Sequence, residues 1–233
     1  MIIPAHPAAR RNFRTAELVA TIALLIVASP TWAAEHAQHD AHRSFDDPAQ
    51  YSQSWDDPAR DAWQRPAELV TALAIRPGMS VADIGTGTGY LLPHLSRATG
   101  ASGTVHAVDV SAKMLEWVAQ RAAREGLRNV RTVKAQGGAT GLPARSVDRA
   151  IMINVWHHID EPAAYARDLA RVLRTNGIVF IVEARPGLQE ADGPPAHFRL
   201  PPERIIAELK SAGLAARLDD FQLDRQYVIR ATR

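Results

Sequence analysis

The chain has 233 residues, of which 46% are hydrophobic and 22% are charged, a composition typical of a globular domain with a sizeable core. The formal net charge is +2, and Arg10, Arg11 and Arg14 against Glu17 supply all of it, so we predict no nucleic-acid partner. There is no cysteine, which excludes disulfides, thiolate metal sites and a cysteine nucleophile.

Residues 1–33 have the layout of a secretory signal peptide. The basic stretch "ARRNFR" precedes an apolar run over 18–28, and "SPTWAA" supplies small residues for cleavage near Ala33 or Ala34. The apolar run is about half the ~20 residues of a membrane span. Arg10-Arg11 also resembles a twin-arginine signature. We therefore expect an exported, periplasmic protein with no stable membrane span after cleavage. An uncleaved membrane anchor and a cytoplasmic protein are the alternatives.

Residues 34–65 are predicted to form a polar tail that leads into a short N-terminal capping segment. His36, His39 and His42 recur every three residues in this tail and are typical of a metal site in that respect. Tails rarely hold a fixed coordination geometry, so we favour a solvated tail and predict no metal site.

From residue 66 to residue 233, apolar strands alternate with amphipathic helices. Helices are expected over 67–75, 89–100, 111–126, 160–177 and 201–213. Strands are expected over 80–85, 103–110, 129–135, 146–155 and 178–184, with two more over 214–233. Ser111 is the expected N-cap of one helix and Asn176-Gly177 the expected stop of another. The pattern predicts a Rossmann-like, doubly wound α/β domain. Its mostly parallel seven-stranded sheet has helices on both faces and ends in a C-terminal antiparallel strand pair.

The stretch "VADIGTGTGY", residues 81–90, places a glycine-rich loop between the first strand of the domain and the next helix, where such sheets bind nucleotides. Gly85, Gly87 and Gly89 occupy its first, third and fifth positions. A dinucleotide fingerprint needs glycine at the sixth position, where Tyr90 stands, so an NAD-dependent oxidoreductase is disfavoured. Asp83 precedes the loop, and a carboxylate there repels a pyrophosphate but suits a ligand with an ammonium group.

The pattern Asp-x-Gly-x-Gly-x-Gly resembles motif I of the class I methyltransferases that depend on S-adenosylmethionine (SAM). Later stretches, such as "LARVLRTNGIVFIVEA", also resemble that family, and the resemblance runs from about Trp55 to Tyr227. It implies SAM as the cofactor, with its methionine part near Asp83 and the glycine loop. The stretch "WDDPARDAWQRP" further resembles a group of exported bacterial methyltransferases.

The cofactor-binding residues predicted in this way lie at the ends of successive strands. An acidic side chain at the end of the second strand accepts hydrogen bonds from ribose hydroxyls, which assigns Asp109 to the ribose. Relatives often carry an acidic residue for the adenine amino group where this chain has Gly138, so we expect Gln136 or the local backbone to replace it. The full predicted set is Asp83, Gly85, Thr86, Gly87, Gly89, Asp109, Val110, Gln136, Gly138 and Asn154.

The stretch "NVWHHID" follows the fourth strand, beside the expected position of the cofactor methyl group. His157 and His158 are the candidate catalytic bases because histidine titrates near neutral pH. Packing and hydrogen bonding are the alternative role for both. Asn154 and Trp156 are candidates to line the same pocket.

Two further segments are candidates for the acceptor site. Tyr51, Trp55, Arg60 and Trp63 either shape an acceptor pocket or pack on the domain as a cap. The stretch "GPPAHFRLPP" offers His197 and Arg199.

The leading hypothesis is therefore SAM-dependent methyl transfer by in-line displacement to an unidentified small-molecule acceptor. A non-catalytic exported nucleoside-binding module is the alternative, followed by an NAD-dependent oxidoreductase. The sequence predicts neither the acceptor nor the oligomeric state.

Overall fold

A computed structural model describes residues 1–2, 45, 47–136, 138–189 and 193–233. The chain divides into two units, residues 1–43 and 44–233, and nearly all of the first lies outside the described residues. Beyond Met1 and Ile2, so do the predicted signal peptide and the candidate metal ligands His36, His39 and His42. Within the described residues, all helices and strands belong to the second unit.

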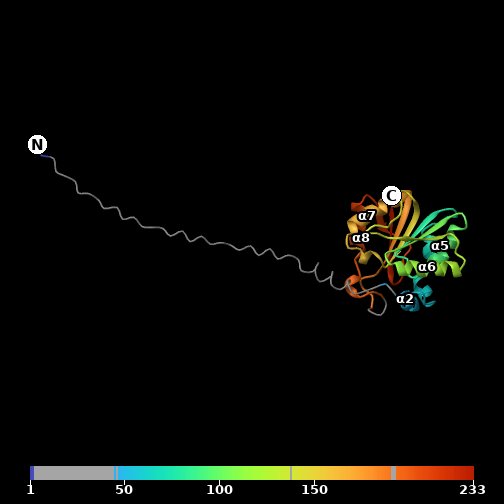
Figure 1. The fold of residues 1–233 in the computed structure, drawn as a ribbon. Helices are drawn as coiled ribbons and strands as arrows, with labels where there is room; N and C mark the ends of the chain where they lie inside the picture. The colour runs from blue at the N-terminus through green and yellow to red at the C-terminus, as the bar shows by residue number, and fades with distance from the viewer. Residues whose placement is uncertain (3–44, 46, 137, 190–192) are drawn as a thin grey trace. The chain divides into compact units, whose positions relative to one another are not determined.

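Seven strands form one sheet in the order β3-β2-β1-β4-β5-β7-β6 (Figure 1). Neighbours from β3 through β5 pair in parallel, and β7 pairs antiparallel with both β5 and β6. This confirms the predicted mostly parallel sheet with its C-terminal antiparallel pair. The strands are β1 (Ser80–Ile84), β2 (Thr104–Asp109), β3 (Val130–Lys134), β4 (Val147–Ile153), β5 (Leu173–Ala184), β6 (Ala215–Leu218) and β7 (Gln226–Thr232).

Helices cover both faces of the sheet, which is why most residues of its central strands are apolar. In β1, Val81 faces a core shared with α4 (Pro66–Ala72), α5 (Leu92–Thr99) and α6 (Ala112–Arg124). Its neighbours Ala82 and Ile84 face the opposite core, which includes side chains of α7 (Pro162–Val172) and α8 (Pro202–Ser211).

Most helix boundaries follow the local sequence signals, and one does not. Ser111 caps α6 as predicted, with its side chain accepting a hydrogen bond from the backbone N–H of Met114 at 3.3 Å. The prediction that α7 continues to Asn176-Gly177 is wrong, because the helix ends at Val172. Leu173 is already extended and pairs with Val147 of β4, so sheet pairing takes this segment into β5 before the turn residues are reached.

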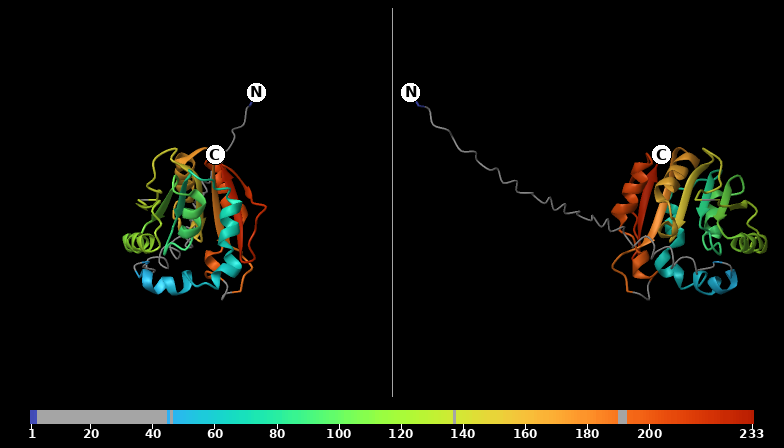
Figure 2. Two further views of the ribbon diagram at one scale, coloured as in Figure 1. Left: turned by 90° about the vertical axis from the view of Figure 1, so that its right-hand side faces the viewer. Right: turned by 60° about the vertical axis from the view of Figure 1, so that its left-hand side comes forward.

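Two short helices, α2 (Pro48–Trp55) and α3 (Arg60–Gln64), precede the alternating domain. Figure 2 shows them at the end of the domain opposite the C-terminus, where β7 finishes. Since β7 runs antiparallel to β5, the parallel strands end on the side of α2 and α3. These helices therefore lie where the sheet is expected to bind its ligand. No helix among the described residues is long and apolar enough to cross a membrane.

Candidate functional site at the carboxyl end of the sheet

The glycine loop begins where β1 ends and turns back towards β2. The backbone N–H groups of Gly85 and Thr86 both donate to the carbonyl oxygen of Val108, at 2.8 and 3.0 Å. Gly85 has φ +69°, and a Cβ atom on it would lie 2.3 Å from a methyl group of Val155. Glycine is therefore required here for both the backbone conformation and the packing of the loop against the segment after β4.

Gly87 joins the loop to two other elements. Its φ is +52°, its N–H donates to Oδ2 of Asp109 at 2.9 Å, and a Cβ atom on it would lie 2.9 Å from the ring of Trp55. Gly89, the third glycine of the motif, also has a positive φ, +85°. The sequence predicted bare backbone next to a ligand, and the structure adds that Trp55 of α2 packs directly on this backbone.

Asp109 ends β2 and is 8% exposed. Its Oδ2 accepts from Gly87, and its Oδ1 accepts from the backbone N–H of Ser111 at 2.8 Å, so one carboxylate links the loop to the start of α6. Burial raises the pKa of Asp109, against these backbone hydrogen bonds. Each oxygen keeps a lone pair for a ribose hydroxyl. Val110, the next residue, is 67% exposed.

Asp83 is 5% exposed, near the end of β1 and directly below the loop. The hydroxyl of Thr86 donates to its Oδ2 at 2.7 Å. Burial raises the pKa of Asp83 to about 6; the Thr86 hydrogen bond opposes this shift, and the negative charge of Asp109 adds to it. This buried site therefore favours a positively charged ligand group, which would compensate the cost of ionising Asp83.

The predicted adenine segment follows β3 beside Asp109. The N–H of Ala135 donates to the carbonyl oxygen of Asp109 at 2.9 Å, and Gln136 and Ala139 then exchange backbone hydrogen bonds of 3.1 and 2.9 Å around a tight turn. Gln136 and Gly138 are both exposed, and Gly138 has φ +77°. The segment therefore lies beside Asp109, and the position predicted to face the adenine carries Gly138 rather than an acidic side chain.

A row of hydrogen-bonded amides connects three elements at this end of the sheet. Gln226 of β7 donates to the Asn154 side chain at 3.0 Å, and its own oxygen accepts from Gln64 of α3 at 2.6 Å. Gln64 is fully buried and Gln226 is 2% exposed. Asn154 has φ +54° just after β4. Sequence reasoning named Asn154 and missed the two glutamines, which stand next to charged residues in the sequence and carry no signal of burial there.

His157 is held by an acidic residue that sequence reasoning also missed. Its Nδ1 lies 2.7 Å from Oε2 of Glu183 in β5, with the side chains 3% and 1% exposed. The other oxygen of Glu183 accepts from the backbone N–H of Trp156 at 2.7 Å. The available signal was a single acidic residue at the end of the apolar strand "IVFIVEA". This pairing restrains the orientation of the His157 ring.

Aromatic rings surround His158. Its ring centroid lies 5.7 Å from that of Phe45 and 5.6 Å from that of Phe198. Phe45 in turn lies 5.6 Å from Tyr51, which stacks on Trp55 at 4.4 Å. The N-terminal aromatic residues therefore approach both the glycine loop and the candidate bases.

Of the other candidates for the acceptor site, Arg199 makes hydrogen bonds that indicate a structural role. It is 7% exposed, and its guanidinium donates to the carbonyl oxygens of Leu188, Gln189 and Pro194, which holds the loop after β5 in shape. His197 is exposed, and its ring centroid lies 4.2 Å from that of Phe198. Within the described residues, no group of three or more histidine or acidic side chains is placed to hold a metal ion.

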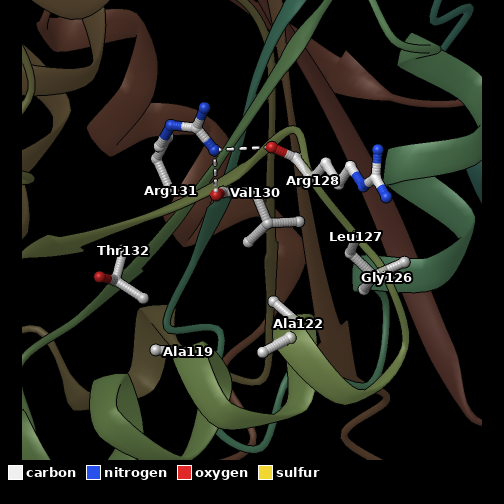
Figure 3. A pocket seen from close by; sticks show the side chains of 9 residues that line it. Ala119, Ala122, Gly126, Leu127, Arg128, Val130, Arg131 and Thr132 are labelled. Atoms are coloured by element: carbon white, nitrogen blue, oxygen red, sulfur yellow. Dashed lines mark hydrogen bonds between the residues drawn. The ribbon is translucent and has the colours of Figure 1, made fainter.

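A surface hollow of about 460 Å³ lies elsewhere, between α6 and the edge strand β3 (Figure 3). Arg131 donates there to the carbonyl oxygens of Arg128 and Val130, both at 2.8 Å. None of the predicted site residues lines this hollow; its lining is Ala119, Ala122, Ala123, Gly126, Leu127, Arg128, Val130, Arg131 and Thr132. We therefore assign no part of the predicted chemistry to it.

Comparison with known proteins agrees with this geometry. Residues 82–181 match a family model described as a methyltransferase domain. A SAM-dependent methyltransferase from Aquifex aeolicus has a similar structure, with a TM-score of 0.74 and 27% identity over 80% of this chain and 98% of that one. Residues 82–181 of this chain therefore belong to a methyltransferase domain. The predicted family and its Rossmann-like fold are confirmed.

Curated relatives of the methyltransferase domain match over part of their length. A ubiquinone/menaquinone biosynthesis C-methyltransferase of Hahella chejuensis is 32% identical over 110 residues, which are 47% of this chain and 44% of that protein. Nocamycin O-methyltransferase of Saccharothrix syringae is 34% identical over 103 residues, 44% of this chain and 36% of that protein. The chain thus spans less than half the length of these relatives. Their names differ in the acceptor atom, carbon or oxygen, so the similarity does not identify an acceptor for the domain.

Proposed function

We propose that the protein transfers the methyl group of SAM to a small-molecule acceptor. The observation that carries this proposal is the pair of buried carboxylates, Asp83 and Asp109, on either side of the glycine loop at the ends of β1 and β2. The methyltransferase-domain match over residues 82–181 supports it. The spacing that ends in Tyr90 disfavours NAD.

The residues at the carboxyl end of the sheet fit this cofactor. Asp83 suits its ammonium group, because burial raises the pKa of that carboxylate even though the positive charge of Arg60 acts in the opposite direction. Asp109 keeps lone pairs for the ribose hydroxyls, and the loop backbone from Gly85 to Gly89 lies between the two acids. SAM supplies a methyl group on a sulfonium, which a nucleophile of the acceptor displaces. The protein's contribution is to align the acceptor and, where it is protic, to remove its proton.

We further propose that His157 is the base that accepts this proton. With the Glu183 carboxylate as acceptor, His157 donates from Nδ1 and keeps Nε2 available to take a proton. The pairing holds the ring in one orientation, which supports the assignment of a positioned base. His157 and His158 both contact neighbouring rings, so the pairing with Glu183 is the feature that favours His157 as the base. The acceptor class that needs such a base is a hydroxyl, amine or thiol of high pKa.

Replacing each histidine separately tests this assignment. With an acceptor found among the small molecules that copurify with the protein, His157→Ala should lower kcat by roughly 10²- to 10⁴-fold, the usual contribution of a positioned base. The dissociation constant of S-adenosylhomocysteine, the demethylated cofactor, should stay unchanged. His158→Ala is the matched control and should retain most of the turnover. Wild-type turnover in His157→Ala would leave that residue with a structural role only.

Ligand-dependent thermal unfolding tests the proposed function itself. SAM or S-adenosylhomocysteine at millimolar concentration should raise Tm, because a ligand that binds only the folded state stabilises it by mass action. NAD should produce no shift, and a shift with NAD alone would favour an oxidoreductase. If cofactor binds but no acceptor from a broad panel is methylated, the exported nucleoside-binding module becomes the better description.

Export by a signal peptide over residues 1–33, with the domain working in the periplasm, is also our proposal. Its support is the basic, apolar and small-residue order of that stretch. The mass of the protein purified from its native cells shows whether these residues have been removed.

A further inference from the structure

The guanidinium of Arg60, the first residue of α3, is hydrogen-bonded to neutral groups. It donates to the carbonyl oxygen of Trp55 at 2.7 Å and to the side-chain oxygen of Gln64 at 3.2 Å. It also lies over the ring of Tyr90, 3.9 Å from the centroid. Among the described residues, none of the hydrogen-bond acceptors of Arg60 is a carboxylate. Burial lowers its pKa, so the charge is desolvated without a direct counter-ion.

The acidic groups around Arg60 are occupied by other partners. Asp61 accepts from the Tyr90 hydroxyl at 2.5 Å, and Asp56 pairs with Arg121 at 2.9 Å. Asp83 is bonded to Thr86, although it interacts electrostatically with Arg60. Arg60 is thus a partly buried cation held near an acid that it does not neutralise.

Three contacts fix Arg60 beside the glycine loop. Tyr90, which it covers, follows Gly89 directly. Trp55, whose carbonyl it binds, packs its ring against Gly87. Gln64 connects it through Gln226 to the end of β4. The guanidinium is therefore held beside the glycine loop, next to the site that the proposed function assigns to the cofactor.

We propose that Arg60 binds the carboxylate of the amino-acid end of SAM, while Asp83 binds the ammonium of the same end. An α-amino acid group carries an ammonium and a carboxylate on the same carbon atom. Its complement in the protein is an anion and a cation that are close together but not bonded to each other, as Asp83 and Arg60 are. Arginine suits this role because its planar guanidinium can donate two parallel hydrogen bonds to a carboxylate. The assignment rests on the proposed function. It makes the N-terminal capping segment a part of the cofactor site.

The test compares SAM with decarboxylated SAM, which keeps the ammonium and the nucleoside but lacks the carboxylate. Binding of each to the full-length protein is measured by titration calorimetry for wild type, Arg60→Gln and Arg60→Lys. Arg128→Gln, which removes an exposed arginine at the α6–β3 hollow, is the matched control. Circular dichroism checks that each variant is folded.

Wild type should bind SAM about 10- to 100-fold more tightly than decarboxylated SAM, the range expected for charge-assisted hydrogen bonds. Arg60→Gln should bind SAM as weakly as it binds decarboxylated SAM, so the preference for SAM is lost. Arg60→Lys should keep part of this preference, and Arg128→Gln should keep all of it. If Arg60→Gln still prefers SAM, the assignment is wrong. In particular, a loss of affinity by the same factor for both ligands would show that Arg60 only supports the conformation of the glycine loop. Failure of wild type to bind either ligand would instead contradict the proposed function, and the assignment with it.

Discussion

Asp83 and Asp109 approach the same glycine loop from neighbouring parallel strands, with Asp83 of β1 paired in register with Ala107 of β2. Burial raises the pKa of both side chains, and the charge of Asp109 adds to the shift of Asp83. Two carboxylates this close to each other in a buried setting are costly to ionise. A ligand with an ammonium group and hydroxyl donors would relieve this cost. We therefore expect the two carboxylates to lower the stability of the ligand-free protein and to favour cofactor binding.

The raised pKa of Asp83 predicts a pH-dependent stability. The folded pKa of about 6 exceeds the usual 3.8, so the folded protein binds the proton more tightly than the unfolded chain does. The free energy of unfolding should therefore fall as the pH rises from about 4 to about 6, by about 1–3 kcal/mol from this residue. Urea unfolding of the ligand-free protein across this pH range measures it.

Asp83→Asn should remove that part of the pH dependence, because an amide does not titrate and still accepts from Thr86. Asp220→Asn changes an exposed carboxylate, 96% accessible, and is the control that should keep the wild-type slope. An unchanged slope in Asp83→Asn would show that Asp83 ionises normally in the folded protein.

The sequence could predict that Asp83, Asp109 and the glycines lie together at the ends of β1 and β2, because this placement depends on local spacing. It could not predict Glu183 as the partner of His157, since the two residues lie 26 positions apart on different elements. It named Arg60 only as one of four candidates for the acceptor site, because the contact of α3 with Tyr90 depends on the fold. Such pairings depend on tertiary packing, which brings distant elements together.

At the scale of elements, α2 contributes no buried residue, so it is held to the domain by a few contacts at its C-terminal end. Trp55 packs on Gly87, and the next residue, Asp56, accepts from the hydroxyl of Thr88 and pairs with Arg121 of α6. A helix with so few anchors is expected to open more easily than the core helices. The described contacts of α2 with the domain are thus made by individual side chains, and none of its residues is buried.

Replacing Trp55 should loosen α2 selectively. In Trp55→Ala, amide hydrogen exchange across residues 48–55 should accelerate by about tenfold or more, since the loss of over ~1.4 kcal/mol of local packing corresponds to that factor. Exchange in α8 should not change. Gln53→Ala, an exposed position on the same helix, is the control. Equal acceleration in both variants would show that Trp55 is not the anchor.

At the scale of the whole molecule, the alternation of apolar strands and helices was enough to predict a doubly wound sheet, because both faces of such a sheet must be covered. The antiparallel final strands followed from the short connection between them. The exact end of α7 did not follow, since pairing of Leu173 with Val147 decides it. Strand pairing across the sheet thus overrode a local stop signal in the sequence.

The hydrogen bond between Gln64 and Gln226 joins residues 162 positions apart, and Gln226 opens the last strand. A ribosome makes the chain from its N-terminus, so α3 is synthesised long before the strand that completes its attachment. The bond to Gln226 can form only after translation is nearly finished, whereas the contacts of α3 with Tyr90 join residues that are made early. The amide row is therefore the last of these attachments to become available during synthesis.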